Sequence, residues 1–297
     1  MVLSKHNLSV VIVSFKSERV IDDCIQSIPE SIEIVVVDNS NNQIFKHNLE
    51  KKYSNLKCVL SSKNLGMGAG NNLGLKFINS DYALILNPDL ILYKDAISQI
   101  VEELQKDISF GILAPLSDNT DYPNYKIKKQ DLKNINDTNR FSVESVDGYA
   151  MVLNLKKLNK IFNDKKNNYF DENFFMYLEN DDLCKRVIEK GEKIFILPKS
   201  KVTHLGAKAV DQKYKYEVEL SRNWHWMWSK FYFNKKHFGY FFALANGLPS
   251  FITAVLKFLI YSMANNVLKK KIYLHRIQGF TNALLGKNSS YRPNVDD

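Results

Sequence analysis

The sequence predicts an α/β protein built around a largely parallel β-sheet. Between residues 8 and 204, short apolar runs alternate with segments of helical periodicity, as in successive strand–helix–strand crossovers. Several of these runs are continuously apolar, which is typical of strands buried on both faces of a sheet. Polar residues follow the runs directly, and open α/β sheets bind ligands at the carboxyl ends of their strands.

Each expected element has its own local pattern. Val20, Ile21, Cys24, Ile25 and Ile28 repeat at helical spacing and define the first helix. Helices are expected at 18–28, in a segment ending near 79, at 95–104 and at 169–190. Apolar, often β-branched runs predict strands at 8–15, 32–37, 56–60, 82–86, 111–115, 145–153, 193–197 and 201–204. The polar stretch 117–142 is expected to be loop.

The composition is that of a globular chain. Of its 297 residues, 45% are hydrophobic and 25% charged, enough for one large or two smaller domains. The three cysteines show neither disulfide nor metal-ligand spacing, which indicates a reducing, cytoplasmic compartment. The first seven residues lack an apolar signal core. We expect a catalytic domain over 1–215 and a helical extension over 216–297.

All the excess positive charge lies in that extension. Residues 222–297 contain 11 Lys and Arg against 2 Asp and Glu, which leaves 30 basic and 30 acidic residues for the first 221. Residues 238–268 carry one charge, Lys257, and Gly247 and Pro249 are expected to break this stretch into two helices. Each would be too short to span a bilayer, which needs about 20 apolar residues.

Two amphipathic helices on an anionic membrane surface, anchored by residues 269–271 (KKK), fit this pattern. A helical cap over the sheet fits it equally well. We expect no nucleic-acid partner, because the charge flanks apolar helices rather than a recognition motif.

The run Tyr82–Leu86 leads straight into Asn87, Pro88 and Asp89. Pro88 cannot donate to a sheet ladder, so the strand ends there and Asp89 lies at its carboxyl end. A carboxylate in that place is suited to hold a divalent cation against a diphosphate. An ordinary turn is the alternative, since Asn-Pro-Asp is common turn chemistry.

Further candidates follow other strands. Asp38 could accept a hydrogen bond from a ribose or base, or cap a helix. Phe15 could stack on a base or lie in the core, and His204 could bind a metal or be structural. Gly66, Gly68 and Gly70 form a G-x-G-x-G that departs from the dinucleotide fingerprint but would allow a phosphate to approach a helix N-terminus.

The segment 170–186 (FDENFFMYLENDDLCKR) contains an acidic cluster with helical spacing. Glu179, Asp182 and Arg186 share one helix face, and Asp181 lies to one side. A carboxylate here could take a proton from an attacking hydroxyl. A solvated acidic helix start is the alternative.

Taken in order, these segments resemble the family-2 glycosyltransferases, which are inverting enzymes with the A-type nucleotide-sugar fold and its mixed, Rossmann-like sheet. The bacterial rhamnosyltransferase-like branch is the most similar. The resemblance covers residues 8–210, more loosely to 290, and is carried by VVIVSF, VVVDNS, NLGMGAGNN, LILNPD, VDGYAMVL, the acidic segment and VTHLG.

The resemblance implies roles for matching positions. The base and ribose would be held by Ser14, Phe15 and Asp38. The sugar-diphosphate pocket would be lined by Asn64, Gly66, Gly70, Asn71 and Asn87, with Gly148 on the acceptor side. Asp89 and His204 would hold a divalent metal, Mg or Mn. The general base would come from Glu179, Asp181 or Asp182.

Two positions depart from the family pattern. Asn87 replaces an Asp that many members have in their Asp-x-Asp motif, so the metal would lose one charged contact. Asn180 replaces the second acid of Glu-Asp-x-Asp, and an amide cannot deprotonate a hydroxyl.

The expected activity is inverting transfer of a sugar, rhamnose or another deoxyhexose, from a dTDP- or UDP-sugar. The acceptor would be a lipid-linked or cell-surface glycan at the inner face of the cytoplasmic membrane. A homo-oligomer is compatible with this. The two asparagines favour an alternative, a non-catalytic nucleotide-sugar-binding scaffold of a polysaccharide assembly complex.

Overall fold

The structure is a computed structural model that describes residues 7–295 except 107, 136–137, 165–166 and 207–208. The chain divides into two compact units. The first holds the described residues of Met1–Leu65, Ala69–Phe170 and Asn180–Asp211. The second holds those of Gly66–Gly68, Asp171–Glu179 and Gln212–Asp297.

The first unit contains a mixed sheet with strand order β3-β2-β1-β4-β10-β6-β11-β5, in which β8 also pairs with β11. The strands are β1 (Leu8–Ser14), β2 (Glu33–Asp38), β3 (Leu56–Leu60), β4 (Tyr82–Leu86), β5 (Leu90–Leu92), β6 (Ile112–Ser117), β8 (Phe141–Ser142), β10 (Ala150–Asn154) and β11 (Ile194–His204). β1 to β4 are parallel, and β10 runs antiparallel to both β4 and β6. A small second sheet pairs β7 (Tyr125–Lys126) with β9 (Ser145–Val146). The predicted α/β architecture is confirmed.

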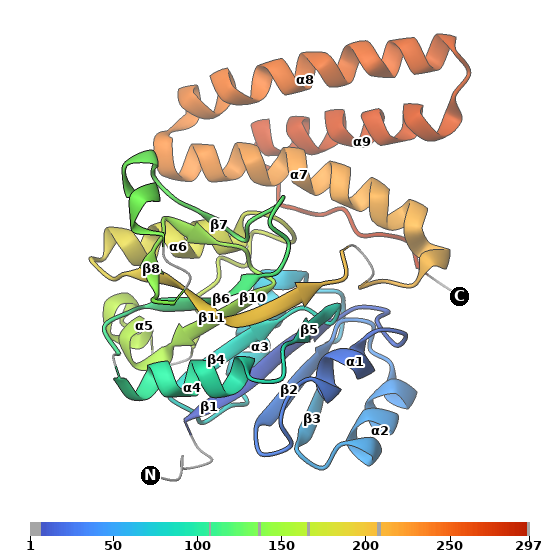
Figure 1. Cartoon of the computed structure of the whole chain (residues 1–297). Coiled ribbons are helices and arrows are strands. Elements are labelled where there is room, and N and C mark those ends of the chain that lie inside the picture. The colour runs from blue at the N-terminus through green and yellow to red at the C-terminus, as the bar shows by residue number, and fades with distance from the viewer. Residues whose placement is uncertain (1–6, 107, 136–137, 165–166, 207–208, 296–297) are drawn as a thin grey trace. The chain divides into compact units, whose positions relative to one another are not determined.

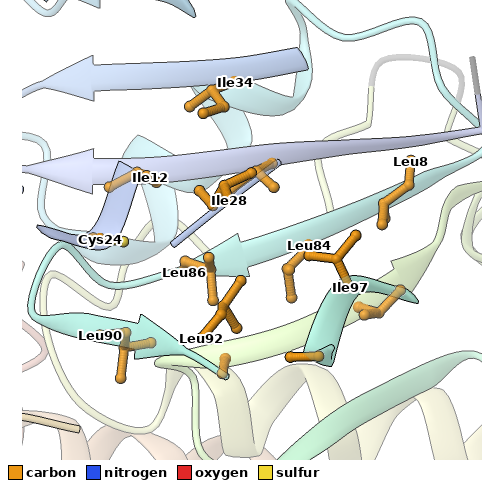
Figure 2. Packing of buried hydrophobic residues seen from close by; sticks show 14 of the residues in the cluster. Leu8, Ile12, Cys24, Ile28, Ile34, Leu84, Leu86, Leu90, Leu92 and Ile97 are labelled. Carbon is orange, nitrogen blue, oxygen red and sulfur yellow. The ribbon is translucent and has the colours of Figure 1, made fainter. Parts of the chain in front are cut away.

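Helices cover both faces of the large sheet (Figure 1). They are α1 (Ile21–Gln26), α2 (Gln43–Lys52), α3 (Met67–Leu75), α4 (Ala96–Lys106), α5 (Leu155–Phe162) and α6 (Glu179–Glu189). Alternate residues of β1 and β4 point to opposite faces, so Ile12 and Leu84 pack with α1, α2 and α4. Val11 and Ile85 pack instead with α3, α5 and α6. Figure 2 shows the first cluster, with Cys24 and Ile97 pointing at the strand side chains.

Several element boundaries differ from the prediction. The polar stretch after β2 forms α2, and residues 117–142 contain β7, β8 and the 3-10 helix Lys129–Asn134. The helix expected from residue 169 begins only at Glu179, because Tyr177 and Leu178 adopt left-handed backbone conformations with φ of 70° and 65°. The two predicted closing strands are one strand, β11, with an irregularity between Leu197 and Lys201.

The second unit is built on three helices after the 3-10 turn Gln212–Tyr214: α7 (Lys215–Phe238), α8 (Tyr240–Met263) and α9 (Val267–Leu284) (Figure 1). The prediction that Gly247 and Pro249 break α8 is wrong, since the helix runs through both. Pro249 removes one backbone hydrogen bond, but Gly247 and Phe251 on either side pack against Phe280 of α9. That packing holds the helix together.

α7 and α9 approach each other at a glycine. A Cβ on Gly279 would overlap the backbone carbonyl of Trp224 on α7. Around this contact, Trp224, Trp228 and Phe231 form a buried aromatic cluster with Phe280. Only a residue without a side chain allows the two backbones to come this close.

Replacing Gly279 with alanine should therefore destabilise the second unit. Alanine is the better helix former by about 1 kcal/mol, whereas overpacking costs about 1–3 kcal/mol, so we expect a net loss and a Tm lower by several degrees. Differential scanning fluorimetry of the full chain measures it. Gln278→Ala, exposed on the same helix, should leave the Tm unchanged or slightly raised. A Gly279→Ala protein that melts above the wild type would contradict the overlap.

Candidate active site

The carboxyl ends of β1, β2 and β4 lie side by side in the sheet. Ser14 is in register with Asp38, and Ile12 with Leu86, the residue before Asn87. The strand order thus brings Ser14, Asp38 and Asn87 to one edge of the sheet, as the sequence predicted. Phe15 follows directly on β1 and is only half-buried.

Asp38 is buried and closes the turn that leads into α2. Its Oδ1 accepts a hydrogen bond from the backbone N–H of Ser40 at 3.0 Å, and its Oδ2 from that of Asn42 at 2.8 Å. Burial raises the pKa of this carboxyl, and the two backbone hydrogen bonds act in the opposite direction. Asp38 does not cap α2, because the N-cap is Asn42, whose side chain accepts from the backbone N–H of Phe45. Asp38 fixes the turn before the helix, and a ribose contact would use its remaining lone pairs.

Asp89 and His204 lie together at the same edge. β5 and β11 place His204 opposite Leu90, and the His204 Nε2 is 3.4 Å from Asp89 Oδ2. The Tyr149 ring packs on the imidazole with centroids 4.4 Å apart. The sequence named Asp89 and His204 separately as metal ligands, and the fold brings them into contact range.

Four buried polar atoms at these positions have no hydrogen-bond partner within the described residues: Ser14 Oγ, Asn71 Oδ1, Asn87 Oδ1 and Asp89 Oδ1. Nearly all buried polar groups in folded proteins are hydrogen-bonded. All four residues belong to the set that the sequence singled out. Oxygen atoms of this kind are what a hard divalent cation or a polar ligand would require.

Two glycines of the G-x-G-x-G segment, Gly66 and Gly70, have packing reasons within their own units. Gly66 has φ of 81°, and a Cβ there would overlap the carbonyl of Phe175, which accepts a hydrogen bond from Met67 at 2.9 Å. A Cβ on Gly70 would come within 2.8 Å of Val13 on β1. Asn64, before Gly66, is half-buried.

The acids at the start of α6 have different environments. Asp182 has no exposed side-chain surface and pairs with Arg186 at 2.8 Å, and Arg186 also donates to the carbonyl of Tyr169. Asp181 pairs with Lys126 at 2.6 Å. Glu179 is buried and belongs to the second unit. The ion pair with Arg186 gives Asp182 a structural role. That Asp182 is the general base stays a prediction, and the buried ion pair argues against it.

Gly148 lies against Asn180. A Cβ on Gly148 would come 3.0 Å from Asn180 Cβ, and the Asn180 amide donates to the carbonyl of Val146 at 2.8 Å. The loop before β10 is therefore fixed to the first turn of α6. The contact with Asn180 is by itself a sufficient reason for a glycine at position 148, and no acceptor substrate is needed to explain it.

Asp147, the residue between Val146 and Gly148, is not among the site residues predicted from the sequence. Burial, and next the negative charge of Asp181, raises the pKa of this half-buried carboxyl, while Lys126 and His204 act in the opposite direction. Asp147 is thus within electrostatic reach of Asp181 on α6 and of His204. Its position directly before Gly148 was the signal available in the sequence.

Comparison with known proteins shows the family of this chain. The glycosyl transferase family 2 profile matches residues 9–178, more than half of the chain. The hexosyltransferase Agl10 of low-salt glycan biosynthesis in Haloferax volcanii is 26% identical over 204 residues, 61% of each chain. The rhamnosyltransferase WbbL of Escherichia coli is 25% identical over 221 residues, 66% of this chain and 82% of WbbL.

Solved structures show the same fold. S. aureus TarS 1-349 superposes with a TM-score of 0.53 at 16% identity over 98% of this chain and 94% of TarS. The mannosyltransferase PcManGT from Pyrobaculum calidifontis, crystallised with GDP-Man and Mn²⁺, gives 0.55 at 13% identity over 96% and 89%. The mixed central sheet is consistent with the family that the profile match identifies. The chain belongs to glycosyl transferase family 2.

Proposed function

We propose that this protein transfers a sugar from a nucleoside diphosphate sugar to a hydroxyl group with inversion at the anomeric carbon. The observation that carries the proposal is a set of buried oxygens without a partner among the described residues: those of Ser14, Asn87 and Asp89 at the edge that also holds the Asp89–His204 pair, and that of Asn71 on α3. The family assignment supports it. Ser14, Phe15 and Asp38 would bind the nucleoside, and Asn64, Gly66, Gly70 and Asn71 the sugar diphosphate.

A divalent cation fits this edge. Asp89 is only 2% exposed, and its free Oδ1 and that of Asn87 are hard oxygen donors. Among the described residues no group of three His, Cys, Asp or Glu side chains forms a metal site, so the ligand shell would draw on the donor's own oxygens. Bound Mg²⁺ or Mn²⁺ would supply positive charge for the leaving diphosphate.

The donor is proposed to be a dTDP- or UDP-linked deoxyhexose such as rhamnose. WbbL, named a rhamnosyltransferase, is one relative that supports this choice. TarS has been crystallised with UDP-GlcNAc and PcManGT with GDP-Man, so these donors are the alternatives. The acceptor is proposed to be a lipid-linked glycan.

A thermal-shift screen of UDP-, dTDP- and GDP-sugars with Mn²⁺ tests donor binding. A ligand at 100 times its Kd stabilises the folded state by about 2.7 kcal/mol, so the true donor should raise the Tm by several degrees. Ser14→Ala should reduce the shift, whereas Asp121→Asn, exposed in the same unit, should not. If no nucleotide sugar raises the Tm at millimolar concentration, the donor site is misplaced.

The non-catalytic scaffold remains the second candidate, because Asn87 and Asn180 stand where the family pattern has acids. A scaffold and an enzyme would bind the same donor but differ in turnover. Release of nucleoside diphosphate, measured with and without Mn²⁺, separates them. Binding without any release in the presence of glycan acceptors would favour the scaffold.

The acceptor assignment is linked to a membrane-binding surface on α8. One face of this helix packs against α7 and α9 through Ala243, Gly247 and Ala254. The opposite face is exposed and almost wholly apolar, and Phe241, Leu256 and Met263 on it are 84%, 55% and 82% exposed. We call this surface the α8 face. It consists of these three residues and Phe242, Ala245, Leu248, Pro249, Ile252, Leu259 and Ile260. Such a continuous patch is rare on a soluble monomer.

We place an anionic bilayer on the α8 face. Between residues 222 and 295 the chain has 11 Lys and Arg and no Asp or Glu, so a second copy of the same face would bring like charges together. Anionic lipid headgroups complement both the charge and the apolar surface. The protein would then lie at the inner face of the cytoplasmic membrane.

Among the described helices, α8 is the one long and apolar enough to cross a bilayer, but its neighbour argues for an in-plane orientation. α9 runs antiparallel beside it. Tyr273 is stacked on Tyr261, and the Phe280 ring packs at a tilt against Phe251 with centroids 4.9 Å apart. A spanning α8 would therefore draw Lys269, Lys270 and Arg276 towards hydrocarbon, which is costly. An in-plane helix leaves these charges at the headgroups.

A further inference from the structure

The proposed sugar transfer needs a group that takes the proton from the attacking hydroxyl, and the first turn of α6 does not offer an obvious one. Asn180 stands where the family pattern has an acid, and its amide is engaged with Val146. Asp182 is fully buried in its pair with Arg186. Asp181 is paired with Lys126. Glu179 is only 8% exposed and belongs to the second unit. A more exposed carboxylate near position 180 would therefore have to come from another element.

The loop of residues 147–149 supplies one. It precedes β10, which runs antiparallel to β4, so the loop lies beside the carboxyl end of β4. The backbone N–H of Asn87 donates to the Tyr149 carbonyl at 2.9 Å, and the Tyr149 ring packs on His204. On its other side the loop lies against Asn180 at Gly148, and Val146, just before the loop, accepts a hydrogen bond from the Asn180 amide.

Asp147 is held at the start of this loop. Its backbone N–H donates to the carbonyl of Asn124 at 2.9 Å, and Asn124, which is buried, in turn donates to the carbonyl of Pro115 at 2.8 Å. The backbone of Asp147 is thus anchored to a strand of the large sheet, while its side chain is only half-buried. Asp181 in the first turn of α6 and His204 both act electrostatically on its carboxyl group.

We propose that Asp147 is the general base of this enzyme and does the work that an acid at position 180 does in the family pattern. The inference rests on the proposed sugar transfer. The acceptor oxygen forms a bond to the anomeric carbon while the bond from that carbon to the diphosphate oxygen breaks. The electron pair leaves with the nucleoside diphosphate, and the hydroxyl proton moves to the Asp147 carboxylate.

The electrostatic environment suits this role. The groups that act on Asp147 are Asp181, Lys126 and His204. Burial and the negative charge of Asp181 raise the pKa of Asp147 above the ordinary value of an aspartate, which makes its carboxylate a stronger base. Lys126, which pairs with Asp181, lowers this pKa and so limits the rise. A base with a raised pKa gives more proton-transfer driving force near neutral pH.

The test compares Asp147→Asn with the wild type of the full chain. We expect the turnover with donor and acceptor to fall by about 10²–10⁴-fold, the range for losing a general base, while the Kd for the donor stays within a factor of about two. Asp121→Asn should keep full turnover. Azide needs no deprotonation, so azide-dependent consumption of the donor should be the same in Asp147→Asn and wild type, which a merely structural role would not produce.

Folding failure is not expected, because asparagine removes a half-buried charge. The raised pKa means that the folded state holds the ionised carboxyl less favourably than the unfolded chain does, so this group lowers stability as the pH rises through that pKa. The Tm of Asp147→Asn should match or exceed that of the wild type, and Asp147→Ser provides a second variant.

Any of three results would overturn the assignment of Asp147. The first is Asp147→Asn with at least half of the wild-type turnover, and the second is Glu179→Gln losing turnover while Asp147→Asn keeps it. A fall in donor affinity that matches the fall in turnover would also overturn it, since it would make Asp147 a binding residue. A wild-type protein that turns over no nucleotide sugar would instead refute the proposed function itself.

Discussion

Replacing Asp89 with alanine should lower turnover by about 10²–10³-fold or more. Asp89 is buried at the carboxyl end of β4, beside His204, with one carboxylate oxygen unpartnered among the described residues. Removing a preorganised group that offsets developing transition-state charge typically costs that much. If the carboxylate holds the cation on the leaving diphosphate, its loss should also abolish the extra thermal stabilisation that Mn²⁺ gives in the presence of UDP or dTDP.

Two matched variants make the Asp89 result interpretable. Asp89→Asn keeps the size of the side chain and should lose nearly as much activity, because a neutral amide is a weaker metal ligand. Asp121→Ala removes an exposed carboxylate from the same unit and should have no effect. Near-wild-type turnover of Asp89→Ala with the true donor would remove the metal role from this residue.

Polar substitutions on the α8 face should release the protein from anionic vesicles. Ile252 and Leu256 lie in the middle of that face, with about half of each side chain exposed. Burying such a side chain contributes about 1.5–3 kcal/mol, and each 1.4 kcal/mol is tenfold. Ile252→Gln combined with Leu256→Gln should therefore weaken vesicle binding by about 10²-fold or more, measured by liposome flotation.

The basic residues beside α8 should contribute separately. Changing Lys269, Lys270 and Lys271 to glutamine should weaken binding to anionic vesicles by about 10²-fold, at about 1 kcal/mol per lysine, and should have little effect on neutral ones. Ile44→Gln combined with Ile108→Gln, both exposed in the other unit, is the control and should bind as the wild type does. A wild-type chain that does not float with anionic vesicles would refute the membrane assignment, and its oligomeric state would then identify a second copy as the occupant.

The α8 prediction also decides between two orientations. An in-plane helix should leave the protein extractable by high salt together with carbonate, and Lys257 open to water-soluble amine reagents. A spanning helix would resist extraction. Because α9 runs beside α8 and carries the lysines, we expect extraction.

Most of the residues at the carboxyl edge of the sheet could be predicted from the sequence, because the end of a strand is a local feature of the sequence. A continuous apolar run that stops at Pro88 places Asp89 without knowledge of any other segment. The same reasoning placed Ser14 and Asp38 after their runs. The parallel order of β1, β2 and β4 then follows from alternation with helices, so the residue order is enough to predict that these side chains share an edge.

The acid assignments depended on contacts that no local pattern contains. Spacing put Asp182 and Arg186 on one helix face, but only the folded structure shows that this pair is buried and holds the carbonyl of Tyr169. The loop that carries Asp147 is more than 30 positions from Asn180 in the sequence, and Asn180 contacts Val146 and Gly148 on either side of Asp147 only in the folded chain.

The sequence alone determined the α/β class, the family resemblance and the polar strand ends, since each rests on short-range order of residue types. Only the tertiary structure decided that α8 continues through Pro249 and that the loop carrying Asp147 lies against Asn180. In both cases the deciding free energy comes from side chains distant in sequence, Phe280 against α8 and Asn180 against the loop of residues 147–149. Local propensity does not include such contacts.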